Sequence, residues 1–223
     1  MAAVGCSGSP SLQGMGDLLG PGGATGESRL VAGLKQALEV GTERAVGRTS
    51  QMNGFLDNPG IRIGLPDSLD TMAKGLRAVG FGAKVDELEV VMNRAAEEAS
   101  AEATAVFWQG IKQMTFSDAR EILAGSDTAA TEYFERTTRT PLAERFEPIV
   151  SERMNAVGLV RDYNALVDRY AAIPFTNKPD LNIESYVTNG ALDGLFKVLG
   201  DEEKRIREDP AARTTALLQE VFR

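Results

Sequence analysis

The chain of 223 residues contains no histidine and a single cysteine, Cys6. Without histidine, hydrolase triads, histidine-ligated zinc and haem sites and metalloprotease helices are excluded, because each of them requires an imidazole. The sequence also lacks a glycine-rich dinucleotide loop, a phosphate-binding loop and a complete calcium-binding loop. We therefore expect a protein that is not an enzyme and that carries no cofactor and no metal ion.

Long hydrophobic runs and an excess of positive charge are absent as well. Mean hydropathy is -0.18, and no uninterrupted apolar stretch approaches the roughly 20 residues that a membrane-spanning helix requires. The formal net charge of -8 argues against nucleic acid, because phosphate backbones are bound by clustered basic residues. The sequence thus predicts a domain that folds in water and that reaches a membrane only through an attached lipid.

The N-terminal segment has a pattern typical of bacterial lipoproteins. A run of small residues ends in Gly5 and Cys6, and Gly, Ser and Pro dominate the segment that follows. An apolar signal segment must precede such a cysteine, and only five residues do so in this sequence. The alternative is a thiol that occurs by chance in a frayed terminus. We expect residues 1–28 to form a tail with Cys6 as its lipidation site, and residues 29–223 to form the folded domain.

Apolar residues recur at helical spacing along the rest of the chain, and no strand-like alternation bounded by hairpin turns occurs. The pattern predicts an all-α fold, a single compact domain of about nine helices. Thr115 and Asp118 have the spacing of a capping box. We interpret Asp180 and Asn182 as alternative caps of another helix, because the glycine and the bidentate glutamate of a calcium loop are missing there. The expected helices cover approximately residues 28–48, 67–79, 83–114, 115–125, 127–137, 141–157, 160–173, 183–199 and 209–222.

Paired carboxylates are the one catalytic arrangement that a chain without histidine still allows, as in glycoside hydrolysis. Glu97 and Glu98 form one adjacent pair, and Glu202 and Glu203 form another. Neighbouring residues on a helix diverge by about 100°, so neither pair can point at one substrate bond. We expect both pairs, together with Glu102, to face solvent.

Two basic, hydroxyl-rich segments are candidate contacts for an anion or for a carboxylate of a partner. One begins at Arg136, and the other contains Arg205, Arg207 and Arg213. The alternative use of these arginines is ion pairing with the chain's own surplus of aspartate and glutamate.

Several short phrases, taken in order, resemble one bacterial family. They are residues 33–38 (GLKQAL), 55–59 (FLDNP), 92–97 (MNRAAE), 114–119 (MTFSDA), 129–134 (AATEYF), 186–188 (YVT), 191–196 (ALDGLF) and 209–215 (DPAARTT). Together they are similar to the family catalogued as domain of unknown function 4197, over residues 28–222. The resemblance implies an exported or lipid-anchored envelope protein and implies no catalytic residues. It strengthens the assignment of Cys6 as a lipidation site.

These observations predict a non-enzymatic binding or structural module of the bacterial cell envelope, lipid-anchored on the periplasmic side, with another envelope protein as its partner. Two alternatives stay open. One is a carrier that holds an apolar ligand between its helices, suggested by aromatic residues expected to point inward. These are Phe107, Trp108, Tyr133, Phe134 and Phe196. The other is a carboxylate-based hydrolase of envelope polymers.

Overall fold

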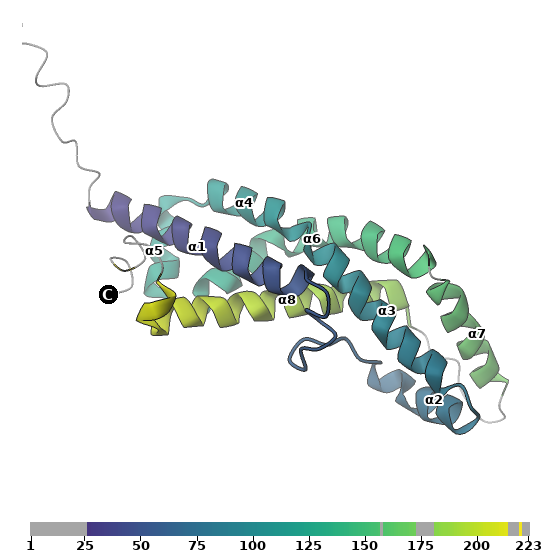
Figure 1. The fold of residues 1–223 in the computed structure, drawn as a ribbon. Helices are drawn as coiled ribbons and strands as arrows, with labels where there is room; N and C mark the ends of the chain where they lie inside the picture. The colour runs from purple at the N-terminus through teal and green to yellow at the C-terminus, as the bar shows by residue number, and fades with distance from the viewer. Residues whose placement is uncertain (1–25, 157, 173–180, 214–218, 220–223) are drawn as a thin grey trace, which may run out of the picture.

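The computed structural model describes residues 26–156, 158–172, 181–213 and 219, and within these ranges it consists of eight α-helices and one short 3-10 helix (Figure 1). The helices are α1 (Gly26–Ser50), α2 (Asp67–Ala78), α3 (Gly82–Ser100), α4 (Ala103–Gln113), α5 (Phe116–Ala124), α6 (Ala129–Ala156), α7 (Leu159–Ala171) and α8 (Ile183–Glu208), and the 3-10 helix spans Pro210–Ala212. No strand occurs in this part of the chain, and the predicted all-α fold is confirmed. Cys6 and most of the expected tail lie outside the described residues.

Helices α1 and α8 lie side by side along the length of the molecule and run in opposite directions (Figure 1). Helices α3 and α6 pack against α8, and α4 packs against α1 and α6. The pair α2 and α7 lies at the far end, beside the start of α3 (Figure 1). Buried apolar side chains from all eight helices join in one continuous core, so the described residues behave as a single packing unit.

Aromatic rings fill the centre of this core. The ring of Phe107 makes edge-to-face contacts with Phe134 and Phe196, at centroid distances of 5.4 and 6.0 Å. Tyr133 is buried next to Phe134, as expected. The expectation for Trp108 was wrong, because the buried face of α4 passes through Phe107 and leaves Trp108 40% exposed.

The expected long helix over residues 83–114 is divided in the structure. Helix α3 ends at Ser100 and α4 begins at Ala103. At the junction, the amide of Ala101 donates to the carbonyl of Glu98, so the backbone tightens to three-residue hydrogen bonds. No glycine or proline marks this break. It separates α3, which packs on α6, α8 and α1, from α4, which packs on α1 and α6. The apolar period continues through it, and the sequence pattern therefore failed to reveal it.

Helix α6 shows the opposite error, since two helices were expected where the structure has one. It continues through Pro141 and Pro148, although a proline inside a helix removes a hydrogen bond and costs about 3 kcal/mol. Burial compensates for this cost, because side chains at every fourth position are covered by neighbouring helices. These are Ala130, Phe134, Thr138, Leu142, Phe146, Val150 and Met154.

The predicted capping box is confirmed at the start of α5. The amide of Asp118 donates to the Thr115 hydroxyl, and the Asp118 carboxylate accepts from the Thr115 amide at 2.9 Å. The Thr115 hydroxyl also donates to Oδ2 of Asp118 at 2.7 Å, and this hydrogen bond, followed by the one from the Thr115 amide, lowers the pKa of the Asp118 carboxyl. The cap of α8 is Asn182, which accepts from the Ser185 amide at 2.9 Å. Its alternative, Asp180, lies outside the described residues.

The segment between α1 and α2, residues 51–66, is called the connector below. It packs against α8 at Gly190 and Gly194. A Cβ atom on Gly194 would come within 2.4 Å of Cε1 of Phe55 and 3.1 Å of Cβ of Ile61. A Cβ atom on Gly190 would meet Ile63 at 3.1 Å. The connector can therefore approach α8 this closely only because positions 190 and 194 are glycines, which have no side chain.

We expect the substitution Gly194→Ala to lower the free energy of unfolding by about 2 kcal/mol, because the new methyl group overlaps a fully buried ring. The matched control is Gly41→Ala in α1, where a Cβ atom meets only Ile206 at 3.7 Å, an ordinary contact. That change should raise stability by as much as about 1 kcal/mol through helix propensity. Urea unfolding of both variants measures the difference, and equal effects would contradict the close approach at Gly194.

Candidate functional site

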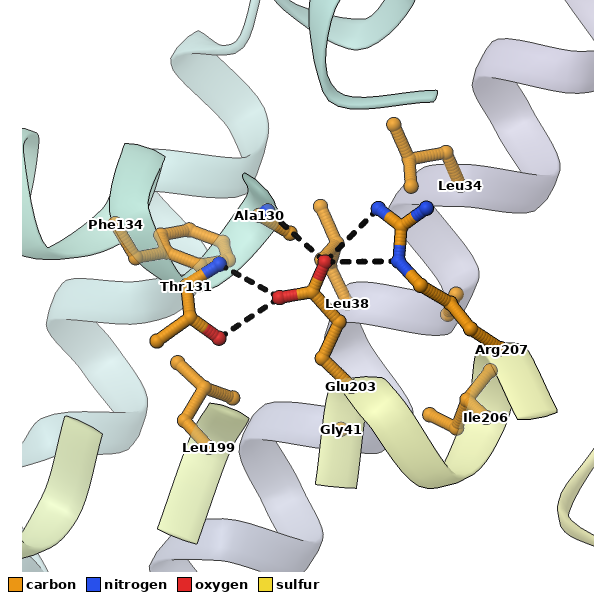
Figure 2. A pocket seen from close by; sticks show the side chains of 11 residues that line it. Leu34, Leu38, Gly41, Ala130, Thr131, Phe134, Leu199, Glu203, Ile206 and Arg207 are labelled. Carbon is orange, nitrogen blue, oxygen red and sulfur yellow. Dashed lines mark hydrogen bonds and ion pairs between the residues drawn. The ribbon is translucent and has the colours of Figure 1, made fainter. Parts of the chain in front are cut away.

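A buried carboxylate holds the start of the longest helix. Glu203 of α8 is 8% exposed and accepts hydrogen bonds from the main-chain amides of Ala130 and Thr131, at 3.0 and 2.8 Å (Figure 2). The hydroxyl of Thr131 donates to the same carboxylate at 2.8 Å. Because the first amides of a helix have no acceptor within the helix, Glu203 supplies one from another helix and also complements the helix dipole.

Arg207 completes this arrangement, which we call the Glu203 clamp. Its Nε and Nη2 atoms donate to Oε1 of Glu203 at 3.0 and 2.9 Å (Figure 2). Nη2 also donates to the carbonyl of Ile122 at 3.0 Å. The clamp therefore joins α8 to the end of α5 as well as to α6. A buried carboxylate with this many donors is a structural element, since its oxygens are occupied by the chain itself.

A second set of buried polar groups lies on α3 and holds the connector. Oε1 of Glu97 accepts from the amides of Phe55 and Leu56 at 3.1 and 3.3 Å, and its other oxygen accepts from Arg94 at 2.6 Å. One turn earlier, Asn93 bonds to the backbone of Ile63 twice. Its Oδ1 accepts from the amide at 2.9 Å, and its Nδ2 donates to the carbonyl at 2.8 Å. The connector is thus tied to α3 by its main chain.

The expectation that both glutamate pairs face solvent was wrong for three of the four residues. Glu97, Glu202 and Glu203 are buried, whereas Glu98 is exposed, as is Glu102. These buried carboxylates are stabilised by hydrogen-bond donors from distant parts of the chain. The local charge pattern therefore does not indicate that the carboxylates are buried. The predicted divergence of adjacent glutamates holds, since Glu202 faces α1 and Glu203 faces α6.

The space beside the Glu203 clamp is too small for an organic ligand. A cavity of about 20 Å³ lies between α1, α6 and α8, next to apolar side chains such as Leu38, Phe134 and Ile206 (Figure 2). It has room for about one water molecule. The larger spaces found are open grooves: about 460 Å³ between α4 and α6, about 400 Å³ between the connector and α8, and about 360 Å³ between α1 and α5.

Two of these grooves are lined by a tyrosine side chain. Tyr133 lines the groove between α4 and α6, and burial, with Asp118 as a second cause, raises the pKa of its phenol. Tyr186 lines the groove between the connector and α8, donates to the carbonyl of Gly64 at 2.9 Å, and has its pKa raised by burial. Both hydroxyls therefore stay neutral near pH 7 and act as hydrogen-bonding groups.

Three arginines meet around Glu202. The carboxylate is 2% exposed, and its Oε1 accepts from Nη1 of Arg48 at 2.6 Å. Nη1 of Arg44 lies 4.0 Å from Oε2, and Nη1 of Arg205 lies 4.0 Å from Oε1. Oε2 is buried and makes no hydrogen bond within the described part of the chain. We call Arg44, Arg48 and Arg205 the arginine cluster.

The structure separates the four arginines that sequence analysis grouped as anion or partner contacts. Arg205 belongs to the arginine cluster, and Arg207 is used by the Glu203 clamp. Arg213 donates to the carbonyls of Ile206 and Arg207 at 3.1 and 2.7 Å, which satisfies the end of α8. Arg136 stacks over the ring of Tyr133 at 5.7 Å. Of these four arginines, only Arg205 thus lies near other solvent-accessible arginines, namely Arg44 and Arg48.

Sequence reasoning missed Arg44 and Arg48. Their four-residue spacing on α1 places them on one face, and the three-residue spacing of Glu202 and Arg205 does the same on α8. These spacings were the available signal. They gain meaning only when α1 and α8 are known to pack against each other.

No helix in the described ranges is long and apolar enough to cross a bilayer. The same residues contain no group of three or more acidic or cysteine side chains placed to hold a metal ion. The features that remain are buried glutamates that accept main-chain amides, and a cationic cluster on an acidic protein. They define an all-α domain in which buried carboxylates hold the connector and the start of α6.

The chain belongs to the family described as "Protein of unknown function (DUF4197)", whose profile matches residues 24–223. This match confirms the family resemblance of the sequence. No curated protein and no solved structure matches the chain. Two of the phrases that carry the resemblance contact each other, because Glu97 in residues 92–97 accepts the amide of Phe55 in residues 55–59.

We expect Glu203→Gln to lower the free energy of unfolding by about 3 kcal/mol, because it replaces an acceptor oxygen by an N–H group and leaves Arg207 without its carboxylate. Glu208→Gln on the same helix is the control, since Glu208 is exposed and forms a surface ion pair with Lys204 at a distance of 3.7 Å. It should change stability by less than about 0.5 kcal/mol. Urea denaturation followed by circular dichroism measures both free energies of unfolding. If Glu203→Gln leaves stability unchanged, the Glu203 clamp does not stabilise the fold.

Proposed function

We propose that this protein is a non-enzymatic module of the bacterial cell envelope that binds another protein, and that a lipid on Cys6 anchors it to the membrane on the periplasmic side. The anchor is supported by the small residues before Cys6 and by the Gly, Ser and Pro content of the segment after it. Membership of residues 24–223 in an uncharacterised family is compatible with this role.

One observation carries the protein-binding part of the proposal: large apolar side chains are held on the outside of firmly packed elements. Trp108 on α4 is 40% exposed, and Phe116 at the start of α5 is 42% exposed. Met52, in the tight turn after α1, is 80% exposed. Tryptophan, phenylalanine and methionine are enriched in protein–protein interfaces, where they supply contact area at low entropic cost.

The two alternative functions have less support from the described residues. A carrier of an apolar ligand needs a mostly apolar cleft or cavity of roughly 300 Å³ or more, and the apolar cavity beside the Glu203 clamp measures about 20 Å³. A carboxylate-based hydrolase needs two carboxyl groups facing one cleft. Each groove described above is lined by at most one carboxylate, such as Glu144 between α4 and α6 and Asp193 beside the connector.

The anchor is tested by intact-mass measurement of the protein purified from its own cells, expressed from its complete natural reading frame. We expect a mass increase that corresponds to acyl chains on Cys6, and recovery in the membrane fraction. The Cys6→Ser variant should lose both. An unmodified wild-type protein that stays in the aqueous fraction would contradict the anchor.

The binding role is tested by chemical cross-linking in the same cells, followed by mass spectrometry of the cross-linked species. The double variant Trp108→Ala/Phe116→Ala should reduce the yield of one discrete complex about tenfold, because exposed aromatic residues dominate interface energy. Val79→Ala/Val90→Ala, which removes two other exposed apolar side chains, is the control and should leave the yield unchanged. A wild-type protein that cross-links to nothing would contradict the proposed function.

A further inference from the structure

The arginine cluster is open on the side away from Glu202. The side chains of Arg48 and Arg205 are 57% and 59% exposed, and that of Arg44 is 31% exposed. We propose that this cluster is a docking site for an acidic segment of a protein partner, whose carboxylates pair with the three guanidinium groups. The inference rests on the proposed protein-binding function and adds the chemistry of the partner.

The charge balance of the cluster supports an incoming anion. Glu202 is the only carboxylate within 4.0 Å of any of the three guanidinium groups, as far as the structure describes the chain. Three cations and one anion leave a local formal charge of two positive units. The whole chain carries -8, so this surplus is opposite in sign to the rest of the protein. An acidic ligand is attracted here and repelled by most of the remaining surface.

Most hydrogen-bond donors of the cluster have no acceptor among the described residues. Each guanidinium group carries five N–H donors. Arg48 donates to Glu202, Arg44 makes one long bond of 3.5 Å to the carbonyl of Ala212, and Arg205 makes no hydrogen bond within the described residues. Guanidinium groups form their strongest contacts as paired hydrogen bonds to carboxylates, and the free donors of Arg44 and Arg205 are available for them.

The position of the cluster is set before any partner binds. Arg44 and Arg48 lie one turn apart on α1, while Arg205 lies one turn after Glu202 on the neighbouring antiparallel helix. Glu202 is buried between these helices and fixes Arg48 at 2.6 Å. Arg48 is therefore ordered before a partner binds, which lowers the entropic cost of binding at this position.

Two observations favour a protein carboxylate over a phosphate. Membranes and nucleic acids carry extended negative charge, and a chain with a net charge of -8 as a whole repels such a surface. In addition, Met52, the most exposed large apolar residue among those the structure describes, lies in the turn after α1, four residues beyond Arg48 in the chain. Arginine and methionine are both enriched in protein interfaces. The partner segment is thus expected to combine acidic and apolar residues.

The probe for this site is a short synthetic peptide of glutamates interspersed with leucines, titrated into the full chain by isothermal calorimetry at low salt. The same peptide with glutamine in place of glutamate is the ligand control. We expect saturable binding of the acidic peptide that weakens as salt is raised, and no saturation with the neutral peptide.

The variant Arg44→Gln/Arg205→Gln removes two open cations and keeps the Arg48–Glu202 pair, so Glu202 stays compensated and the fold is preserved. It should raise the Kd of the acidic peptide about tenfold, a loss of about 1.4 kcal/mol. The control Arg145→Gln/Arg153→Gln removes two arginines of similar exposure, which lie 3.9 and 3.6 Å from their carboxylates. This control should leave the Kd within about twofold.

The inference is overturned if wild-type protein does not bind the acidic peptide saturably, or if both double variants lose affinity equally. It is also overturned if inorganic phosphate or phosphatidylglycerol vesicles compete for the cluster more strongly than the peptide does. Cross-linking separates this inference from the proposed function. If Arg44→Gln/Arg205→Gln captures the same complex in cells at full yield, the docking site is wrong and the protein-binding role stands.

Discussion

The contact on which the helix arrangement depends is the carboxylate of Glu203 at the start of α6. It gives the first amides of that helix an acceptor in a place that water does not reach, and it connects α8, α6 and, through Arg207, α5. Helix α6 in turn packs against α3, α4 and α8. A buried charge is stable only when its hydrogen bonds are made, so this contact forms with the correct helix packing or not at all.

The same principle operates along α3. Asn93 and Glu97 lie one turn apart and accept hydrogen bonds from connector amides such as those of Phe55 and Ile63, which the turns of the connector do not satisfy. The glycines of α8 allow that connector to approach closely from the other side. Polar groups therefore specify which segments meet, while the apolar core supplies the driving force for packing.

This use of glutamate inside the protein has a consequence for its surface. Glu202 is buried between α1 and α8, and three arginines surround this single carboxylate. Exposed Trp108, Phe116 and Met52 are likewise held outside by elements whose other faces are buried. Because the interior is filled by side chains, recognition of a partner, as proposed above, depends on the outer surface.

The sequence by itself determined the helical class, the capping box at Thr115 and the family, because these depend on residues a few positions apart. It left Asp180 and Asn182 as alternative caps of α8, of which the structure shows Asn182 in that role. It also led to the right inward aromatic residues with the exception of Trp108. Tertiary structure alone decided the division between α3 and α4, the continuity of α6 through Pro141, and the burial of Glu97, Glu202 and Glu203. It alone joined Arg205 to Arg44 and Arg48. These features arise where distant helices meet, and the energy of a buried charge or an interior proline depends on those neighbours rather than on the local pattern.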